Sequence, residues 1–273
     1  MVDFQQKNFY SISDLLDIVR LLRSENGCPW DKEQTHISIK SDFLEEACEV
    51  IEAIELQDTA LLREELGDVL LQVVFHCRIE EETNSFCFDD VCDEICKKLI
   101  IRHPHVFGNV QADNSEQVLK NWDAIKMETK NQKTYTDTLN SVPNTLPALM
   151  KAQKVGKRAM RAGMDFRCTE DAFACIDKEK AELEQAILSD NSANIEEEIG
   201  DLLFSCVNVA RHLGVNAEFA LKAATDKFIK RFSITEKLTA SDDLDMKTLS
   251  IEELDTYWDK SKNIINSEVS KND

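Results

Sequence analysis

Acidic side chains at helical spacing stand out in one stretch of the chain, residues 44–68. The carboxylates with this spacing are Glu45, Glu46, Glu49, Glu65 and Asp68. Glu46 and Glu49 are three residues apart, as are Glu65 and Asp68, so each pair shares one face of a helix. Like charges held that close repel one another unless a cation binds among them. Because hard divalent ions prefer oxygen ligands, the stretch predicts a site for Mg²⁺, with Mn²⁺ or Ca²⁺ as the next choices.

An acidic helix is more often a solvated face than a metal site, but here the pattern occurs twice. The carboxylates of the second copy are Glu179, Glu182, Glu198 and Asp201, each 133 positions after its counterpart. The same offset relates Gly200 to Gly67 and Arg211 to Arg78. A solvated face has no need to keep four carboxylates in register across two copies, so the repeat favours binding of a divalent cation.

The spacing of apolar residues predicts an all-α fold built from two tandem helical domains. The 273 residues include only 7 Gly and 4 Pro, and apolar side chains recur at the helical period. A polar turn at Gln57 and Asp58 predicts two antiparallel helices, whose acidic faces then meet. The expected organisation is a domain over residues 1–128, a polar linker over 129–147 and a domain over 148–273. Residues 68–75 and 201–209 are apolar on more than one face, which predicts helix partners in a dimer.

Charge and cysteine content exclude several classes of protein. A formal net charge of −20 argues against binding of nucleic-acid polymers and of anionic membranes. The nine cysteines are scattered among apolar positions with no C-x-x-C motif, which indicates a reducing cytoplasm without disulfides or a zinc site. No apolar run near 18 residues occurs, so we expect neither a signal peptide nor a membrane span.

Basic and aromatic residues follow each acidic copy in the same order, K-x-x-x-R and then W-x-x-x-K. They are Lys98, Arg102, Trp122 and Lys126 in the first half, and Lys227, Arg231, Trp258 and Lys262 in the second. Cations near a helix C-terminus often only complement the helix dipole. Together with a metal, however, they suit a phosphate chain, and the Trp offers a flat face to a base.

These parts together indicate hydrolysis of a phosphoanhydride. A divalent metal lowers the pKa of a water, and a free carboxylate can take its proton. The chain contains no G-x-x-x-x-G-K-[ST] loop and no G-x-G-x-x-G motif, which argues against P-loop and dinucleotide-binding proteins.

Two further motifs have simpler structural explanations. Trp30 follows a helix break at Gly27 and Pro29, where we expect a buried Trp that plugs the domain rather than one beside a substrate pocket. His103 and His105 flank Pro104, and a capping or surface role is favoured over zinc because no third ligand lies at suitable spacing.

The combined motifs closely resemble the MazG-type nucleoside triphosphate pyrophosphohydrolases over nearly the whole chain. The segments that carry the resemblance are NGCPWDKEQT, LEEACEVIEAI, REELGDVLLQVVF, RHPHVF, VPNTLPALMKAQK and EEEIGDLLFSCVNVARHLG. The resemblance implies an all-α, Mg²⁺-dependent enzyme that splits a nucleoside triphosphate into the monophosphate and pyrophosphate. It also implies a homodimer with intertwined helices and a role in house-cleaning or control of nucleotide levels.

The resemblance also assigns residues. The first copy matches the family pattern fully, whereas in the second copy Lys178 stands where the first Glu is expected. In members with two copies the second is usually credited with catalysis, and its Lys/Arg pair and Trp match Lys227, Arg231 and Trp258. Lys178 would either offset a carboxylate or contact a phosphate.

Two alternatives remain open at this point. One is a pyrophosphohydrolase of the same helical build that acts on a single deoxynucleotide or on phosphoribosyl-ATP. The other is a non-catalytic helical module that binds a divalent ion or a partner, which would leave the repeated basic and Trp residues without a role.

Overall fold

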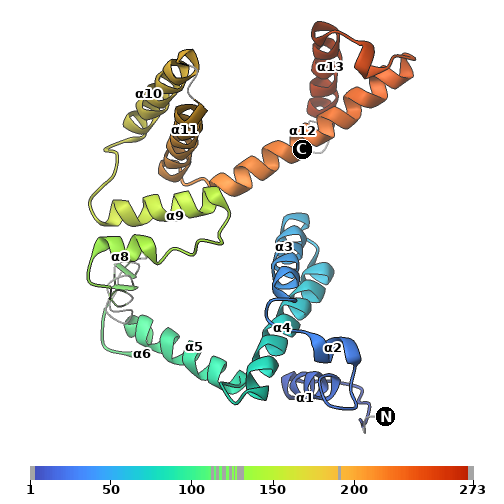
Figure 1. Cartoon of the computed structure of the whole chain (residues 1–273), viewed down its shortest axis with the longest axis vertical. Helices are drawn as coiled ribbons and strands as arrows, with labels where there is room; N and C mark the ends of the chain where they lie inside the picture. Colours follow the sequence, from blue (N-terminus) through green and yellow to red (C-terminus); the bar gives the residue numbers. More distant parts are fainter. Residues whose placement is uncertain are drawn as a thin grey trace. The chain divides into compact units, whose positions relative to one another are not determined.

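The computed structural model describes residues 4–111, 114, 117–118, 121–122, 125, 127, 132–189 and 192–269. These residues form helices and connecting loops, without a β-strand in the described ranges (Figure 1). The chain divides into two compact units, Met1–Lys126 and Met127–Asp273. The predicted all-α tandem fold is confirmed. None of the described helices is both long enough and apolar enough to cross a membrane.

Each unit is built around a pair of long helices. Unit 1 contains α1 (Ile12–Leu22), α2 (Pro29–Glu33), α3 (Lys40–Leu56), α4 (Thr59–Glu82), α5 (Phe88–Arg102) and α6 (Pro104–Phe107). Unit 2 contains α8 (Tyr135–Asn140), α9 (Ala148–Arg161), α10 (Thr169–Leu188), α11 (Ser192–His212), α12 (Ala217–Ser241), the 3₁₀ helix η1 (Met246–Thr248) and α13 (Ile251–Val269). The exact boundaries of the two domains and the linker stay a prediction, and α8 lies within the expected linker.

The turn that joins α3 to α4 lies where the sequence predicts it. Gln57 ends α3 in the left-handed conformation, with φ of 55°. Asp58 caps α4, because its carboxylate accepts hydrogen bonds from the backbone N–H groups of Ala60 and Leu61 at 2.9 and 3.1 Å. This tight connection places α3 and α4 side by side (Figure 1).

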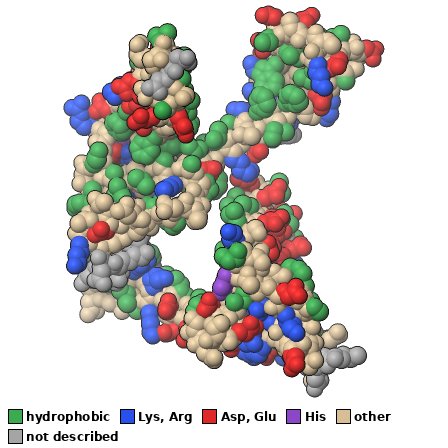
Figure 2. All heavy atoms as spheres, viewed as in Figure 1, with side chains coloured by type: hydrophobic (Ala, Val, Ile, Leu, Met, Phe, Trp, Pro, Cys, Tyr) green, Lys and Arg blue, Asp and Glu red, His purple; other side chains and the backbone are tan. Residues whose placement is uncertain are grey.

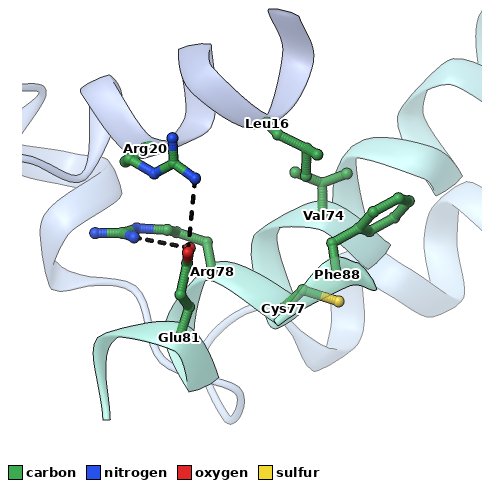
Figure 3. A pocket seen from close by; sticks show the side chains of 7 residues that line it. All are labelled: Leu16, Arg20, Val74, Cys77, Arg78, Glu81 and Phe88. Carbon is green, nitrogen blue, oxygen red and sulfur yellow. Dashed lines mark hydrogen bonds and ion pairs between the residues drawn. The ribbon is translucent and has the colours of Figure 1, made fainter. Parts of the chain in front are cut away.

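The core of unit 1 lies between α1 and α4. Val19 and Val74 are fully buried there, and Ile39 and Phe75 complete the cluster. Figure 3 shows one edge of this contact, where Arg20 of α1 and Arg78 of α4 both reach Glu81, at 3.6 and 2.8 Å.

The cavity at that edge is not a substrate site. Its volume is about 20 Å³, which is enough for roughly one water molecule. Apolar side chains, Leu16, Val74 and Phe88 among them, close the rest of it (Figure 3). The contact between α1 and α4 therefore serves to hold α4, which carries two of the candidate metal ligands.

The expected burial of Trp30 is wrong, since 60% of this residue is exposed. Pro29 begins α2 at its first position, and a helix of five residues has too little surface to cover an indole ring. The segment is fixed through its backbone instead. The Arg23 guanidinium donates hydrogen bonds to the carbonyl oxygens of Asp31 and Gln34, at 2.5 and 3.1 Å.

In unit 2, α11 packs on α9 through a close contact at Gly156. A Cβ at Gly156 would lie 3.1 Å from Asn208 Oδ1 and 3.2 Å from Arg211 Nε. Arg211 in turn binds the Asp165 carboxylate with both of its terminal nitrogens. This pairing lowers the pKa of Asp165 to about 2, with Arg211 as the main cause. The ion pair links the loop after α9 to the end of α11.

Apolar side chains remain exposed on the long helices of both units. They include Leu66 and Leu70 on α4, and Ile199, Leu203 and Phe204 on α11, with exposed fractions between 39% and 51%. Figure 2 shows such side chains at the surface of each unit, beside the acidic groups of the α10–α11 pair. Faces of this kind on consecutive turns are the surfaces that the sequence predicts to have helix partners.

Candidate metal centre

The structure brings three glutamates of the first copy together between α3 and α4. One carboxylate oxygen from each of Glu46, Glu49 and Glu65 lies within 4.8 Å of the others. Glu46 and Glu49 project from one face of α3, and Glu65 projects from α4, as the spacing predicts. Asp68 lies close enough to raise the pKa of Glu46 through charge repulsion. Glu45, the remaining predicted ligand, is exposed and outside this group.

The second copy repeats this arrangement between α10 and α11. Oxygens of Glu179, Glu182 and Glu198 again lie within 4.8 Å of one another. Glu179 is the most buried, with 9% of its surface exposed, and Glu182 is exposed. Asp201 is exposed one turn beyond Glu198 and adds to the negative charge that Glu198 experiences.

Burial and like charge together make the ionised state costly in both clusters. Burial raises the pKa of Glu46 and Glu65, and neighbouring carboxylates raise it further. The pKa of Glu198 is raised by burial first, and then by Glu182 and Asp201. A divalent cation bound among these oxygens would offset the repulsion between the carboxylates.

One atom of the second cluster is left without a partner. Glu198 Oε2 is buried and accepts no hydrogen bond. Buried carboxylate oxygens without a donor are rare because the lost hydration is costly. The residues present therefore fit a hard cation, which would satisfy this oxygen directly.

Lys178 lies on the second cluster instead of the expected glutamate. Its ammonium is 2.9 Å from Glu182 and 3.6 Å from Glu179. The hydrogen bond to Glu182 is the main cause that raises the pKa of Lys178. This contact corresponds to the first of the two roles considered from the sequence, in which Lys178 offsets carboxylate charge.

The predicted basic and aromatic residues of unit 2 gather on α12 and α13. The ring of Trp258 packs on Phe228 at 5.0 Å between centroids, and Lys227 is exposed next to that Phe in the sequence. Arg231 Nε is buried without a hydrogen-bond partner. Lys262 pairs with Asp259 at 2.8 Å.

In unit 1 the corresponding cation lies on the Trp itself. The Arg102 guanidinium is 5.3 Å from the centroid of Trp122, and His103 meets the ring edge-on at 4.9 Å. Lys98 is exposed on α5, and Lys126 lies outside the described residues. Among the described residues, Lys178 is the one predicted substrate-binding cation that forms an ion pair with a carboxylate cluster.

Two residues near Glu179 were missed from the sequence. Cys175 Sγ donates a hydrogen bond to Glu179 Oε1 at 3.5 Å, and Ser205 Oγ is 3.4 Å from the same sulfur. Cys175 comes one helical turn before Glu179, so the sequence alone could have placed both side chains on one face of the helix. The contact with Ser205 depends on how α10 packs on α11, which spacing alone does not give.

Both carboxylate clusters lie in segments that match one family of known proteins. A model of the MazG nucleotide pyrophosphohydrolase domain matches the chain twice, over residues 34–107 and 169–233. Each matched segment contains one complete set of candidate ligands.

The chain belongs to the MazG family. The nucleoside triphosphate pyrophosphohydrolase of Escherichia coli K12 is 44% identical over 256 residues, which cover 92% of this chain and 97% of that protein. The nucleoside triphosphate pyrophosphohydrolase/pyrophosphatase MazG of Thermotoga maritima is 42% identical over 249 residues, or 91% and 94% of the two chains. The uncharacterized protein YabN of Bacillus subtilis is 41% identical over 255 residues, 93% of this MazG chain and 52% of YabN. The family resemblance inferred from the sequence is confirmed.

The raised pKa of Glu198 gives a prediction for stability. Because the folded-state pKa is above the ordinary value of 4.5, the folded protein binds protons that the unfolded chain has already released. Stability from this group therefore falls as pH rises from about 4.5 through the raised pKa. At neutral pH in EDTA, we expect Glu198→Gln to raise the melting temperature and to reduce the further rise caused by Mg²⁺.

Differential scanning fluorimetry with EDTA and with Mg²⁺ measures both effects. Glu196→Gln is the matched control, since Glu196 is exposed on the same helix and outside the cluster. A Glu198→Gln protein that melts lower than the wild type in EDTA and keeps the full response to Mg²⁺ would contradict the repulsion argument.

Proposed function

We propose that this protein hydrolyses nucleoside triphosphates to nucleoside monophosphates and pyrophosphate, with Mg²⁺ as cofactor and Mn²⁺ as a possible substitute. The observation that carries the proposal is the convergence of three glutamate oxygens within 4.8 Å in each copy, inside segments matched by a nucleotide pyrophosphohydrolase domain. The names of the E. coli and T. maritima relatives describe the same activity. Broad acceptance of bases would fit a house-cleaning role.

The second cluster is the proposed reaction centre, with Glu179, Glu182, Glu198 and Asp201 as the residues that hold the cation. When bound, the cation supplies positive charge for the phosphate oxygens and lowers the pKa of a water. A carboxylate oxygen not used for the cation takes the proton of the attacking water. The oxygen of this water forms a bond to the α- or β-phosphorus while the bridging P–O bond breaks, and pyrophosphate is released.

The basic residues on α12 and α13 are proposed to bind the rest of the substrate. Lys227 and Arg231 are one turn apart, and the partnerless Arg231 Nε can donate a hydrogen bond to a phosphate oxygen. Trp258 presents its ring to the base, and Lys262 extends the positive charge on α13. Lys178, once a cation replaces it at Glu182, is free to contact a phosphate oxygen.

The first copy has its own set, for which we propose cation and phosphate binding. Its ligands are Glu45, Glu46, Glu49, Glu65 and Asp68, and its substrate contacts are Lys98, Arg102, Trp122 and Lys126. The face of Trp122 already holds Arg102, so a base would have to compete with the guanidinium. We rank the second copy as the stronger candidate for turnover, because Arg231 Nε has no hydrogen-bond partner whereas Arg102 already lies on Trp122.

Our first expectation here concerns products and metal. Purified protein with Mg²⁺ and each ribo- and deoxynucleoside triphosphate should release monophosphate and pyrophosphate in equal amounts, and metal-stripped protein in EDTA should release neither. Ion-exchange chromatography separates these products from the diphosphate and inorganic phosphate. Stoichiometric release of diphosphate would overturn the proposed reaction. Turnover of a single substrate would favour a base-specific enzyme, and cation binding without any turnover would favour a non-catalytic module.

A second expectation ranks the two copies. Glu198→Gln and Asp201→Asn each keep the size of the side chain but remove a negative ligand, so we expect about 10²-fold or greater loss of activity. The matched changes in the first copy, Glu65→Gln and Asp68→Asn, should lower activity by less than about tenfold, because they affect a site that is not the proposed reaction centre. Steady-state rates at several Mg²⁺ concentrations measure both. If the first-copy variants are inactive and the second-copy variants retain near-normal rates, the ranking is reversed.

We also propose a homodimer in which helices of two copies cover one another's apolar faces. The exposed Leu70 on α4, and Leu203 and Phe204 on α11, are the side chains that such a contact would bury. Light scattering at micromolar concentration should report twice the chain mass of 31.1 kDa. Leu203→Glu should shift the protein toward the monomer, whereas the exposed Leu188→Glu, at the end of α10, is the control. A monomeric wild type would contradict this proposal.

A further inference from the structure

The buried glutamate of the second cluster is held by a short chain of hydrogen bonds. Glu179 and Cys175 lie one turn apart on α10, and Ser205 comes from the facing helix α11. Ser205 is buried, with 4% of its surface exposed. The two distances, 3.5 Å from Sγ to Glu179 Oε1 and 3.4 Å from Sγ to Ser205 Oγ, are normal for hydrogen bonds that involve sulfur.

The direction of these bonds follows from the hydrogens available. An ionised carboxylate only accepts, so the single thiol hydrogen of Cys175 is donated to Glu179. The sulfur has no second hydrogen, and the Ser205 hydroxyl must therefore donate to it. The chain runs in one direction, from hydroxyl to thiol to carboxylate, and it fixes one oxygen of Glu179.

In the first copy, the described residues at the equivalent positions do not form this chain. Asp42 and Gln72 occupy the positions 133 residues before Cys175 and Ser205. Asp42 carries a carboxylate, which has no hydrogen to give to Glu46 when ionised. Gln72 Oε1 is buried without a hydrogen-bond partner. Among the described residues, no thiol or hydroxyl chain reaches Glu46, whose side chain instead contacts the Glu49 carboxylate.

We propose that Cys175 and Ser205 are positioning residues, which hold the Glu179 carboxylate in place for the divalent cation. Residues that hydrogen-bond a metal ligand typically contribute about 10- to 100-fold to metal affinity. Neither residue belongs to the group of converging carboxylates, so we expect their effect on the strength of cation binding rather than on the chemical step. The inference rests on the proposed metal-dependent function, but it can be measured without turnover.

Direct binding of Mn²⁺ tests the proposal. Titration followed by electron paramagnetic resonance is carried out on full-length protein that carries Glu46→Gln and Glu65→Gln, so that the second cluster is observed alone. In this background we expect Cys175→Ala and Ser205→Ala to weaken Mn²⁺ binding by about tenfold. Cys175→Ser retains a donor and should stay within about threefold of the parent protein. Cys206→Ala is the control, since this neighbouring thiol is exposed.

Activity in the wild-type background gives a second measurement. The apparent affinity for Mg²⁺ should fall in Cys175→Ala, while the rate at saturating Mg²⁺ stays within about threefold of the wild type. A purely structural defect would lower the saturated rate or the helical circular dichroism signal, and Cys175→Ser would not restore cation binding.

The possible results separate this inference from the proposed function. Unchanged Mn²⁺ binding in a folded Cys175→Ala protein, or weak binding in Cys175→Ser equal to that of the alanine variant, overturns the positioning role. Weakened binding with serine rescue, in a protein that releases no pyrophosphate from any nucleotide, supports the positioning role and refutes only the proposed reaction.

Discussion

Repulsion among carboxylates that two helix pairs hold within 4.8 Å is the constraint on which the rest of this structure depends. Such a cluster lowers stability without a cation, so packing elsewhere must keep the helices together. In unit 1 this is done by the Asp58 cap at the turn and by the core between α1 and α4. In unit 2 the close contact at Gly156 and the ion pair of Arg211 with Asp165 secure the α10–α11 pair.

The two copies differ in how far the carboxylate repulsion is relieved. In the first copy the raised pKa values of Glu46 and Glu65 express the full cost, because no cationic side chain contacts the cluster among the described residues. In the second copy Lys178 partly neutralises Glu182, and a thiol orients Glu179. The first copy therefore keeps more negative charge, while in the second a lysine and a thiol contact the carboxylates.

Helix spacing predicted that Glu46, Glu49 and Glu65 share one place, because side chains three apart on one helix lie on the same face. It also included Glu45, which lies outside the converging group. The turn at Gln57 and Asp58 could also be predicted, because two polar residues between two segments with helical apolar spacing favour a turn. The exposure of Trp30 could not be predicted, because it depends on which side chains fill the core beside the very short helix α2. The contact of Ser205 with Cys175 was likewise out of reach, because it depends on the register between α10 and α11. Spacing describes a single helix, and these features belong to pairs of helices.

Lys178 has a consequence for ion selectivity. Its ammonium already provides one positive charge at Glu182, at a distance of 2.9 Å, and being part of the chain it cannot diffuse away. Na⁺ or K⁺ would replace one unit of charge by another and lose translational freedom in doing so, which gives no net electrostatic gain. A dication brings an additional charge and can displace the ammonium with a gain in attraction. At the proposed site, a lysine beside the carboxylates would therefore favour divalent over monovalent ions.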